Sequence, residues 1–590
     1  MKPKLFNENT KKEILPLVAC FLLSGFVVWW YLFLNRHLCL FYREQSQMFL
    51  FSPEYFRQYL EQPGGITAYA ASFLTQFFYY PAVGAGIYLL IFLGLYRIFK
   101  LVLNEFSLFG RSFIAALIPG MLFLPASINL QFDIADELAI IFALSGFILL
   151  TKMIRNRFYD VFVPLAISVF YILVGGNVAL ILILFIFYLF VKQQKDAWKQ
   201  IPAAILSLSI PVALWYVFYL TSFKDACTSL TPFRYPDANW TDCRMIAWLS
   251  MVVMPVAGML FKNVKAGRKW TLSYNIGLSL ILPVMVLKLY SPDTGNIVKM
   301  GYDAENDNWE RMIHTGKETS VGPLNCFYTN LALQKTGQLA EKMFCYDQIG
   351  TPGLILDMQD NFSCQAKSEL FYRLGLVNEA QRYAYESMIG YASVKEPNIR
   401  NLKRLLECAV IRKDSALSAK YEKMLDKTLF YKDYAKRRIV KYPPAIAMKD
   451  IFIRDMSVAL ASILEDNPGN QAVFEYLMAY YLLEREYEKA KSCYDRYFSN
   501  FSYPRIPVHY AEFLMLYKRI NKLDDSFYAL YPVSRDIRER FEMMDILVSS
   551  EMDRQIQKAL EDGYRDTYWF YVRFPLVSVQ TIKQDEKNIY

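Results

Sequence analysis

Long apolar runs fill the first 290 residues and stop there, whereas the rest of the chain mixes apolar and polar positions. A helix needs about 20 mostly apolar residues to cross a bilayer, because its backbone polar groups must be satisfied within the segment. The pattern predicts an all-α chain with a transmembrane domain over 1–290. Nine spans are predicted, at about 14–34, 78–99, 113–130, 137–151, 160–175, 177–191, 201–221, 246–261 and 272–290. The runs between 113 and 191 are short, so a re-entrant pair is an alternative there.

The distribution of Lys and Arg predicts the orientation of these spans. With the N-terminus inside, the inside segments hold 17 Lys and Arg residues, and the outside loops before residue 291 hold six. Lys and Arg concentrate on the cytoplasmic side of membrane proteins. Nine spans then place the C-terminal part of the chain outside the cytoplasm. The sequence therefore predicts a multi-pass membrane protein with an extracytoplasmic C-terminal domain.

The polar half after a linker at 291–322 reads as a series of helix pairs over 323–590. Small residues and a Gly turn separate the helices of a pair, as at Gly337 and Gly375. This pattern is typical of degenerate tetratricopeptide-like repeats, which stack into a solenoid with an extended concave surface. A non-repetitive helical bundle is the alternative. The many Tyr and Phe residues of this half are expected in the helix-packing core.

Net charge and cysteine content limit which partners and which metal sites the sequence indicates. The net charge of +9 is explained by the cytoplasmic loops and a mildly charged helical domain, so it does not indicate a nucleic-acid partner. Three histidines and the absence of a Cys-x-x-Cys motif argue against a zinc site. Cys227 and Cys243 share one predicted outside loop, where they either form a disulfide or stay as free thiols.

The longest predicted outside loop, 35–77, combines aromatic residues with Arg43 and Arg57, as expected for helices that lie in the membrane interface. Glu44 follows the first span by about ten residues. In the loop 222–245, Arg234 suits the binding of a lipid phosphate, and anchoring at the interface is the alternative.

The second outside loop carries Asp133, Asp136 and Glu137 without a cation. In a helix these carboxylates fall at i, i+3 and i+4, on one face. Three acids at a membrane surface are costly to leave unpaired. They indicate a general base, or a site for a divalent cation such as Mg²⁺ or Mn²⁺ beside a phosphate. A solvated acidic loop that reinforces the topology is the alternative.

The whole chain resembles an uncharacterised family of bacterial polytopic membrane proteins with a tetratricopeptide-like C-terminus. Three phrases carry this resemblance: Pro63-Gly64-Gly65, Phe77-Phe78-Tyr79-Tyr80-Pro81 and Leu374-Gly375-Leu376-Val377-Asn378-Glu379-Ala380. The resemblance implies a place in the bacterial inner membrane and brings no activity.

In its layout the chain also resembles the C-type integral-membrane glycosyltransferases. They share an inside N-terminus, a long first outside loop with interfacial helices, and acids in the first two outside loops. The resemblance implies transfer of a sugar from a polyprenyl-phosphate donor to a lipid, glycan or protein acceptor. It places Glu44 at the position of the base or metal contact. The chain departs from the family here, because Glu44-Gln45 stands where an acidic pair is usual.

Three functions follow as hypotheses. In a sugar transferase, Glu44 or Asp133 would deprotonate the acceptor, Arg43, Arg57 or Arg234 would hold the donor phosphate, and the solenoid would bind a protein or glycan acceptor. In a scaffold, the spans would anchor a solenoid that collects envelope proteins. A transporter is disfavoured, because no charged residue lies deep in a predicted span and no repeat symmetry is visible.

Overall fold

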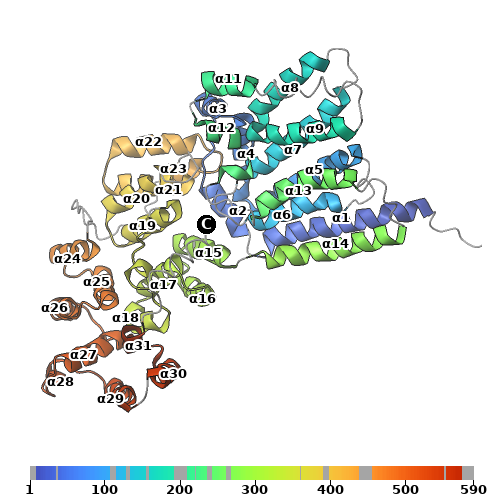
Figure 1. Cartoon of the computed structure of the whole chain (residues 1–590). Helices are drawn as coiled ribbons and strands as arrows, with labels where there is room; N and C mark the ends of the chain where they lie inside the picture. Colours follow the sequence, from blue (N-terminus) through green and yellow to red (C-terminus); the bar gives the residue numbers. More distant parts are fainter. Residues whose placement is uncertain are drawn as a thin grey trace, which may run out of the picture. The chain divides into compact units, whose positions relative to one another are not determined.

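The computed structural model is built of helices joined by turns (Figure 1). It describes residues 8–34, 37–106, 114–127, 133–153, 159–191, 209–219, 221–235, 242–260, 268–290, 292–358, 360–389, 398–437, 455–550 and 553–574. Every regular element in these ranges is an α-helix or a 3₁₀ turn. The all-α prediction is confirmed for this part of the chain.

The chain forms two compact units. The first unit comprises 1–291 together with 423–435, and the second comprises 292–422 and 436–590. The segment predicted as a linker, 291–322, is not an extended connection. It holds the helices α15 (Pro292–Glu305) and α16 (Trp309–Lys317), which pack against each other within the second unit.

Three stretches of the first unit are long and apolar enough to cross a membrane: α5 (Pro81–Glu105), residues Ile134–Lys152 of α7 (Ile134–Met153), and Leu165–Phe190. Two bent helix pairs raise the number to five if each pair is one span: Val18–Leu32 with His37–Gln45, and Ile276–Lys288 with Pro292–Glu305. Exposed apolar side chains such as Phe21 (77%) and Leu90 (70%) suit contact with lipid. These features indicate membrane association.

The described helices thus give three to five spans by length and composition, where the apolar runs predict nine. Two predicted spans contain helices well below the required length, α6 (Ile118–Ala126) with nine residues and α11 (Ser209–Phe218) with ten. The predicted spans 113–130 and 201–221 lie partly outside the described residues.

The stretch Leu165–Phe190 is interrupted by a 3₁₀ turn, η4 (Gly175–Asn177), between α8 (Tyr159–Val174) and α9 (Val178–Val191). Gly175 has φ +58°, and a Cβ on Gly176 would lie 2.1 Å from the carbonyl oxygen of Cys227. The buried Asn177 amide donates to the Leu230 carbonyl and accepts from the Trp248 indole at 3.0 Å. The turn therefore locks α9 to the loop 221–235 and to α13 (Cys243–Leu260).

The loop after the first span folds into α2 (His37–Gln45), α3 (Pro53–Leu60) and α4 (Gly65–Thr75). Ser52 caps α3 by accepting from the Tyr55 amide, and Pro53 occupies the first helical position. Phe49 packs edge-on against Tyr55 and Phe73, with ring centroids about 5.4 Å apart in each pair. These aromatic contacts hold the loop helices together.

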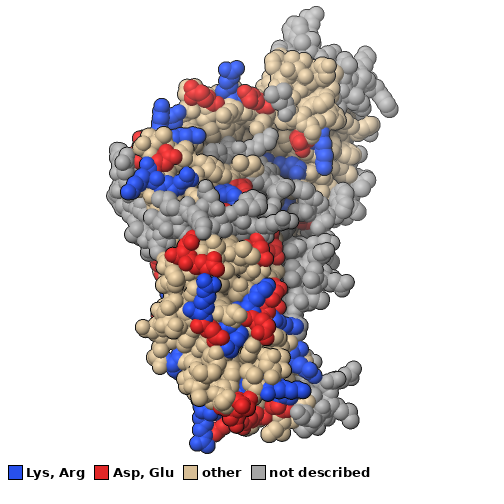
Figure 2. All heavy atoms as spheres, turned by 90° about the vertical axis from the view of Figure 1, so that its left-hand side faces the viewer, with Lys and Arg blue, Asp and Glu red and all other residues tan. Residues whose placement is uncertain are grey.

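The second unit is a succession of short helices, several of which pack on the next helix in the chain. Its main elements are α17 (Pro323–Lys335), α19 (Asn361–Arg373), α20 (Val377–Ile389), α21 (Ile399–Ile411), α22 (Ser415–Asp426), α24 (Met456–Asp466), α25 (Gln471–Glu484), α26 (Tyr487–Tyr497), α27 (Val508–Ile520), α29 (Arg535–Ser550) and α30 (Asp553–Tyr564). Gly375 ends α19 at φ +84°, and the Leu376 amide donates back to the Phe371 carbonyl at 2.8 Å. On the face shown in Figure 2, basic and acidic side chains are interspersed.

A buried carboxylate joins two helices of the second unit. Glu369 of α19 is 3% exposed and pairs with Arg373 at 2.7 Å and with Arg404 of α21. Arg404 also lies over the Tyr372 ring, 3.7 Å from its centroid. We call Glu369, Arg373 and Arg404 the Glu369 cluster. Burial would raise the pKa of the Glu369 carboxyl, but the charges of Arg404 and Arg373 outweigh it and lower the pKa below its usual value.

Candidate functional site

The three predicted acids of the second outside loop lie at the start of α7. Asp133 is half-buried, and its carboxylate accepts from the Ala135 amide at 2.9 Å. Asp136 and Glu137 occupy the first helical turn, where a carboxylate is favoured by the helix dipole. Both are buried, at 1% and 4% exposure. The acids are thus placed on one helix end, as the spacing predicts, but two of them are not solvated.

Asp136 is paired with Arg234. The Arg234 guanidinium lies 3.2 Å from one carboxylate oxygen, and the Tyr235 hydroxyl donates to the other at 2.8 Å. Arg234 also donates to the Tyr235 hydroxyl at 2.8 Å. Burial would lower the pKa of Arg234, but the charge of Asp136 outweighs it and raises the pKa. Arg234 therefore stays cationic, and Asp136 compensates its charge.

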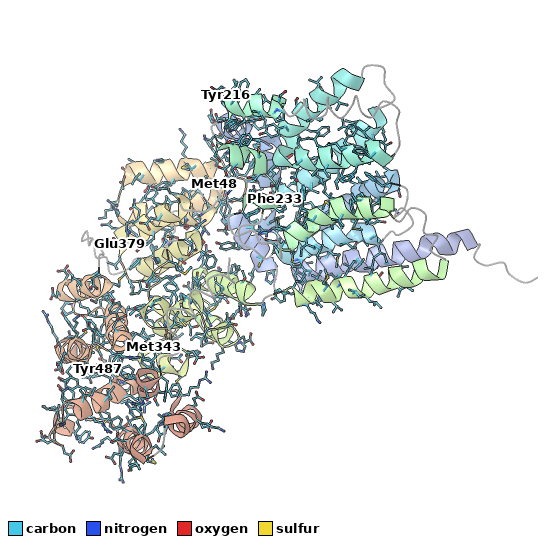
Figure 3. All side chains as sticks on the ribbon, in the orientation of Figure 1. Met48, Tyr216, Phe233, Met343, Glu379 and Tyr487 are labelled. Atoms are coloured by element: carbon cyan, nitrogen blue, oxygen red, sulfur yellow. The ribbon has the colours of Figure 1, made fainter. Side chains whose placement is uncertain are left out.

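A second arginine approaches the same tyrosine. Arg244, on the first turn of α13, makes two hydrogen bonds from its Nε to the Asp242 carboxylate at 3.0 Å. The guanidinium groups of Arg244 and Arg234 lie 4.1 and 4.8 Å from the centroid of the Tyr235 ring. Phe233, labelled in Figure 3, belongs to the 3₁₀ turn Pro232–Arg234. Its ring packs edge-on against Trp248 of α13, with the ring centroids 5.4 Å apart. Arg234 Nε and Arg244 Nη1 are buried without a hydrogen-bond acceptor in the described part of the chain.

Arg43 of α2 connects the loop 35–77 to α7. Its guanidinium donates to the Tyr88 hydroxyl and to the Ser127 carbonyl, and it interacts electrostatically with Glu137. The side chain is 7% exposed. Residues 43 and 137, from the two loops singled out in the sequence, thus belong to one buried network.

Glu44, the neighbour of Arg43, has different partners. Its carboxylate accepts from the Tyr431 hydroxyl at 2.5 Å and from the Gln45 amide at 2.6 Å. Tyr431 belongs to the segment 423–435 of the first unit. Gln45 gives a physical reason for the missing acidic pair, because a second carboxylate at this position would repel Glu44 where the amide donates to it.

The hydroxyl of Tyr431 is expected to stabilise the first unit measurably. Tyr431→Phe removes the donor from a carboxylate that is 3% exposed, so we expect a loss of about 1.5 to 3 kcal/mol of unfolding free energy. Thermal unfolding of the purified full-length protein measures it. Tyr80→Phe is the matched control, since Tyr80 is 52% exposed and should change little. Equal stability of both variants would contradict the assignment.

The remaining predicted site residues lie apart from this network. Arg57 is exposed on α3, and no contact with the acids is seen in the described part of the chain. Cys227 and Cys243 are both free thiols in the structure. The three acids were expected to hold a divalent cation together. Among the described residues, no three His, Cys, Asp or Glu side chains are grouped as metal ligands, because Asp136 and Glu137 face different arginines.

The sequence did not single out Tyr235, Tyr88 or Tyr431 as partners of these acids. Tyrosines are frequent throughout the chain, so the sequence around a tyrosine does not indicate that its hydroxyl pairs with a distant acid. Asp242 and Arg244, two positions apart at the start of α13, form an ion pair that their short spacing could have indicated.

The chain is similar to a known family over most of its length. Residues 12–575 match the model of a family described as "Family of unknown function (DUF6057)". The chain belongs to this family. No curated protein matches the chain, and no solved structure matches it.

Proposed function

We propose that the chain is a membrane glycosyltransferase-like protein. It transfers a sugar from a polyprenyl-phosphate-linked donor to an envelope acceptor on the outer face of the membrane. The proposal rests on one observation: Arg43 of the first outside loop, the acids at the start of α7, and Arg234 come together at one end of the membrane helices. Charged groups from three separate segments meet there, beside apolar helices where unused charge is costly.

The roles follow from the partners of each group. Asp133 is the half-buried acid. Its carboxylate accepts from the Ala135 amide and interacts electrostatically with Arg234, and we assign it the role of the general base. Asp136 and Glu137 hold Arg234 and Arg43 in place. The unsatisfied N–H groups of Arg234 and Arg244 suit the donor phosphate, since guanidinium groups bind phosphate through paired hydrogen bonds. Glu44, whose carboxylate accepts from the Tyr431 hydroxyl, borders the proposed site on the side of α2.

The proposal includes the finer architecture predicted from the sequence. Nine spans with the N-terminus inside place the second unit outside the cytoplasm. Its helix pairs act as a tetratricopeptide-like solenoid whose concave surface recognises a protein or glycan acceptor. Gly337 and Gly375, which end α17 and α19 in left-handed backbone conformations, support the paired-helix arrangement.

Asp133→Asn tests the assignment. We expect it to lower transfer at least about 100-fold, the usual contribution of a general base. The measurement uses full-length protein in vesicles with undecaprenyl-phosphate-linked glucose, together with envelope glycan profiles of cells that carry the variant. Asp225→Asn, at an exposed carboxylate of the helix α12 (Phe223–Thr228), is the control. Unchanged glycan profiles at normal protein levels would rule out the catalytic role.

A non-enzymatic scaffold is the second candidate. It is favoured by the pairing of Asp136 with Arg234 and of Glu137 with Arg43, because such pairs also serve a purely structural end. A scaffold predicts that Asp133→Asn leaves envelope glycans unchanged, while the full-length protein still co-purifies with the same envelope proteins.

A further inference from the structure

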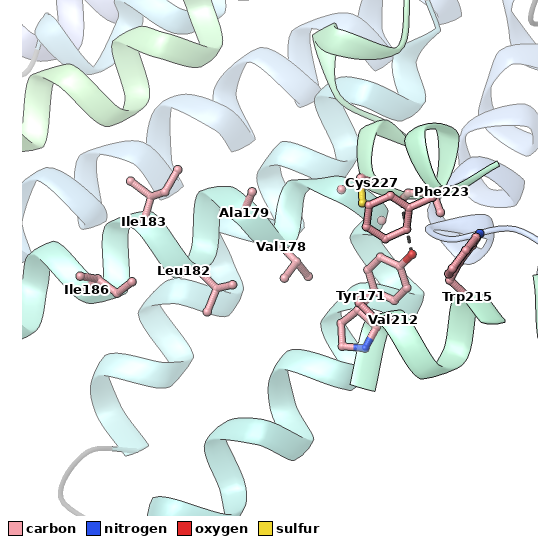
Figure 4. A pocket seen from close by; sticks show the side chains of 14 residues that line it. Tyr171, Val178, Ala179, Leu182, Ile183, Ile186, Val212, Trp215, Phe223 and Cys227 are labelled. Atoms are coloured by element: carbon pink, nitrogen blue, oxygen red, sulfur yellow. Dashed lines mark hydrogen bonds between the residues drawn. The ribbon is translucent and has the colours of Figure 1, made fainter. Parts of the chain in front are cut away.

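A pocket of about 440 Å³ lies among α8, α9, α11 and α12 of the first unit (Figure 4). This volume is within the range of small-ligand sites, about 300 to 1,000 Å³. One face of α9 lines it from Val178 through Leu182 to Ile186. At 1.5 Å per residue, this wall is about 12 Å long and runs along the helix axis. The pocket is therefore an elongated groove.

The chemistry of the lining is apolar. Its residues include no charged side chain. The Tyr171 hydroxyl already donates to the Ala226 carbonyl at 3.3 Å, and the Trp215 indole donates to the Thr221 carbonyl at 2.8 Å. A polar ligand would lose its hydration without gaining partners, so the groove selects against it.

The surroundings of the groove indicate the occupant. α9 lies within Leu165–Phe190, one of the three stretches able to span a membrane, so lipid is the medium around it. Val212 and Phe223 are 46% and 51% exposed, and they leave the groove open at its side. Trp215 and Phe223 form an edge-to-face pair at the α12 end, at 5.1 Å. Aromatic side chains favour the membrane interface, which places the polar end of a lipid there.

We propose that this groove binds one hydrocarbon chain of a membrane lipid, with the chain along α9 and the headgroup at the α12 end. The occupant is an acyl chain of a phospholipid, because α9 lies in a stretch able to span a membrane, where phospholipid surrounds it. This site does not rest on the proposed sugar transfer, because a non-enzymatic membrane protein can hold a lipid chain in the same way.

Photo-crosslinking of the full-length protein in vesicles tests the groove. One set of vesicles contains phosphatidylcholine with a diazirine in its acyl chain, and the other contains an isoprenyl phosphate with a diazirine in its chain. We expect the phosphatidylcholine probe to label residues 178–186 and 211–215, as located by mass spectrometry. Labelling of these residues by the isoprenyl phosphate probe alone would overturn the assignment to a phospholipid.

Ala179→Trp is the decisive variant, because Ala179 is an exposed lining residue and an indole there fills the groove. We expect labelling to fall about tenfold, which corresponds to about 1.4 kcal/mol of binding free energy. Val169→Trp adds the same side chain at a residue of α8 that is 56% exposed and does not line the groove, and it should leave labelling unchanged. Equal labelling of the two variants would overturn the proposal.

The unmodified protein supplies a second measurement. Cys227 lines the groove and is exposed, and Cys345 is an exposed thiol of the second unit. A bound chain should slow the reaction of Cys227 with N-ethylmaleimide relative to Cys345 when either lipid probe is added. No change in this ratio with either probe argues against occupation. Groove labelling in the unchanged protein together with no detectable sugar transfer would refute the proposed enzyme and leave the lipid site standing.

Discussion

Replacement of Arg234 by methionine is expected to lower the unfolding free energy of the first unit by about 3 to 5 kcal/mol. Asp136 is 1% exposed, and Arg234 is its cationic partner at 3.2 Å. Methionine retains much of the length of the side chain but leaves the carboxylate with the Tyr235 hydroxyl as its described donor and the weaker charge interaction with Arg244. Removing one partner of a buried ion pair costs more free energy than the intact pair contributes, because the remaining charge is still shielded from water.

Unfolding of the full-length protein in mixed micelles with increasing dodecyl sulfate, followed by tryptophan fluorescence, measures this loss. Arg57→Met is the matched control, since Arg57 is exposed on α3 and should change stability by less than about 1 kcal/mol. The double variant Arg234→Met with Asp136→Asn should recover part of the loss, because the stranded charge is gone. If Arg234→Met and Arg57→Met are equally stable, the pair does not exist as described.

Replacement of Glu369 by glutamine is the second large expected effect, a loss of about 3 to 5 kcal/mol in the second unit. Glutamine has nearly the same volume, so packing is preserved. The variant removes the carboxylate that both Arg373 and Arg404 contact, at 6% and 13% side-chain exposure. Arg373 keeps Asp307 at 2.8 Å and Arg404 keeps Glu407 at 3.0 Å, so the loss comes from the two ion pairs of Glu369 itself. Chemical denaturation of the full-length protein, monitored by circular dichroism, should show the early unfolding of this unit.

The same carboxyl gives a pH dependence of defined sign. Its pKa is lowered from 4.5 in the folded unit, so its stabilising effect is present above pH 4.5 and is lost as the pH falls below it. In Glu369→Gln this part of the acid sensitivity should disappear. Glu386→Gln is the control, because Glu386 and Arg382 are 37% and 44% exposed, and such surface pairs contribute about 0.2 to 1 kcal/mol. A Glu369→Gln curve parallel to that of the unchanged protein would contradict the expectation.

Local pattern predicted much of the fold. The sequence predicts a turn at Gly375 between two helices. Gly375 ends α19 because a helix C-terminus favours a residue that tolerates positive φ. Composition predicts a boundary near residue 290, but it does not predict that the first unit also includes 423–435. Such features depend on a few neighbouring residues, which a sequence displays directly.

The partners of the site acids could not be predicted in this way. Asp136 meets Tyr235 across 99 positions of the chain, and Glu44 meets Tyr431 across 387. Helical spacing indicates that Asp133, Asp136 and Glu137 share a helix end, but the side chains packed opposite them decide whether they gather round a cation or divide between arginines. Apolar content likewise does not reveal where a run breaks, as η4 does at Gly175, because the cause is close packing with a distant loop.

The contact between Glu44 and Tyr431 also determines how late in synthesis the first unit can be completed. Ribosomes add about 5 to 20 residues per second, so the 387 positions between the two residues correspond to about 20 to 80 s of synthesis. Throughout that interval α2 is already made, and the Tyr431 hydroxyl that donates to its carboxylate is not. A nascent chain that stops before residue 423 carries the helices described within 1–291 and still lacks the segment 423–435 of the first unit.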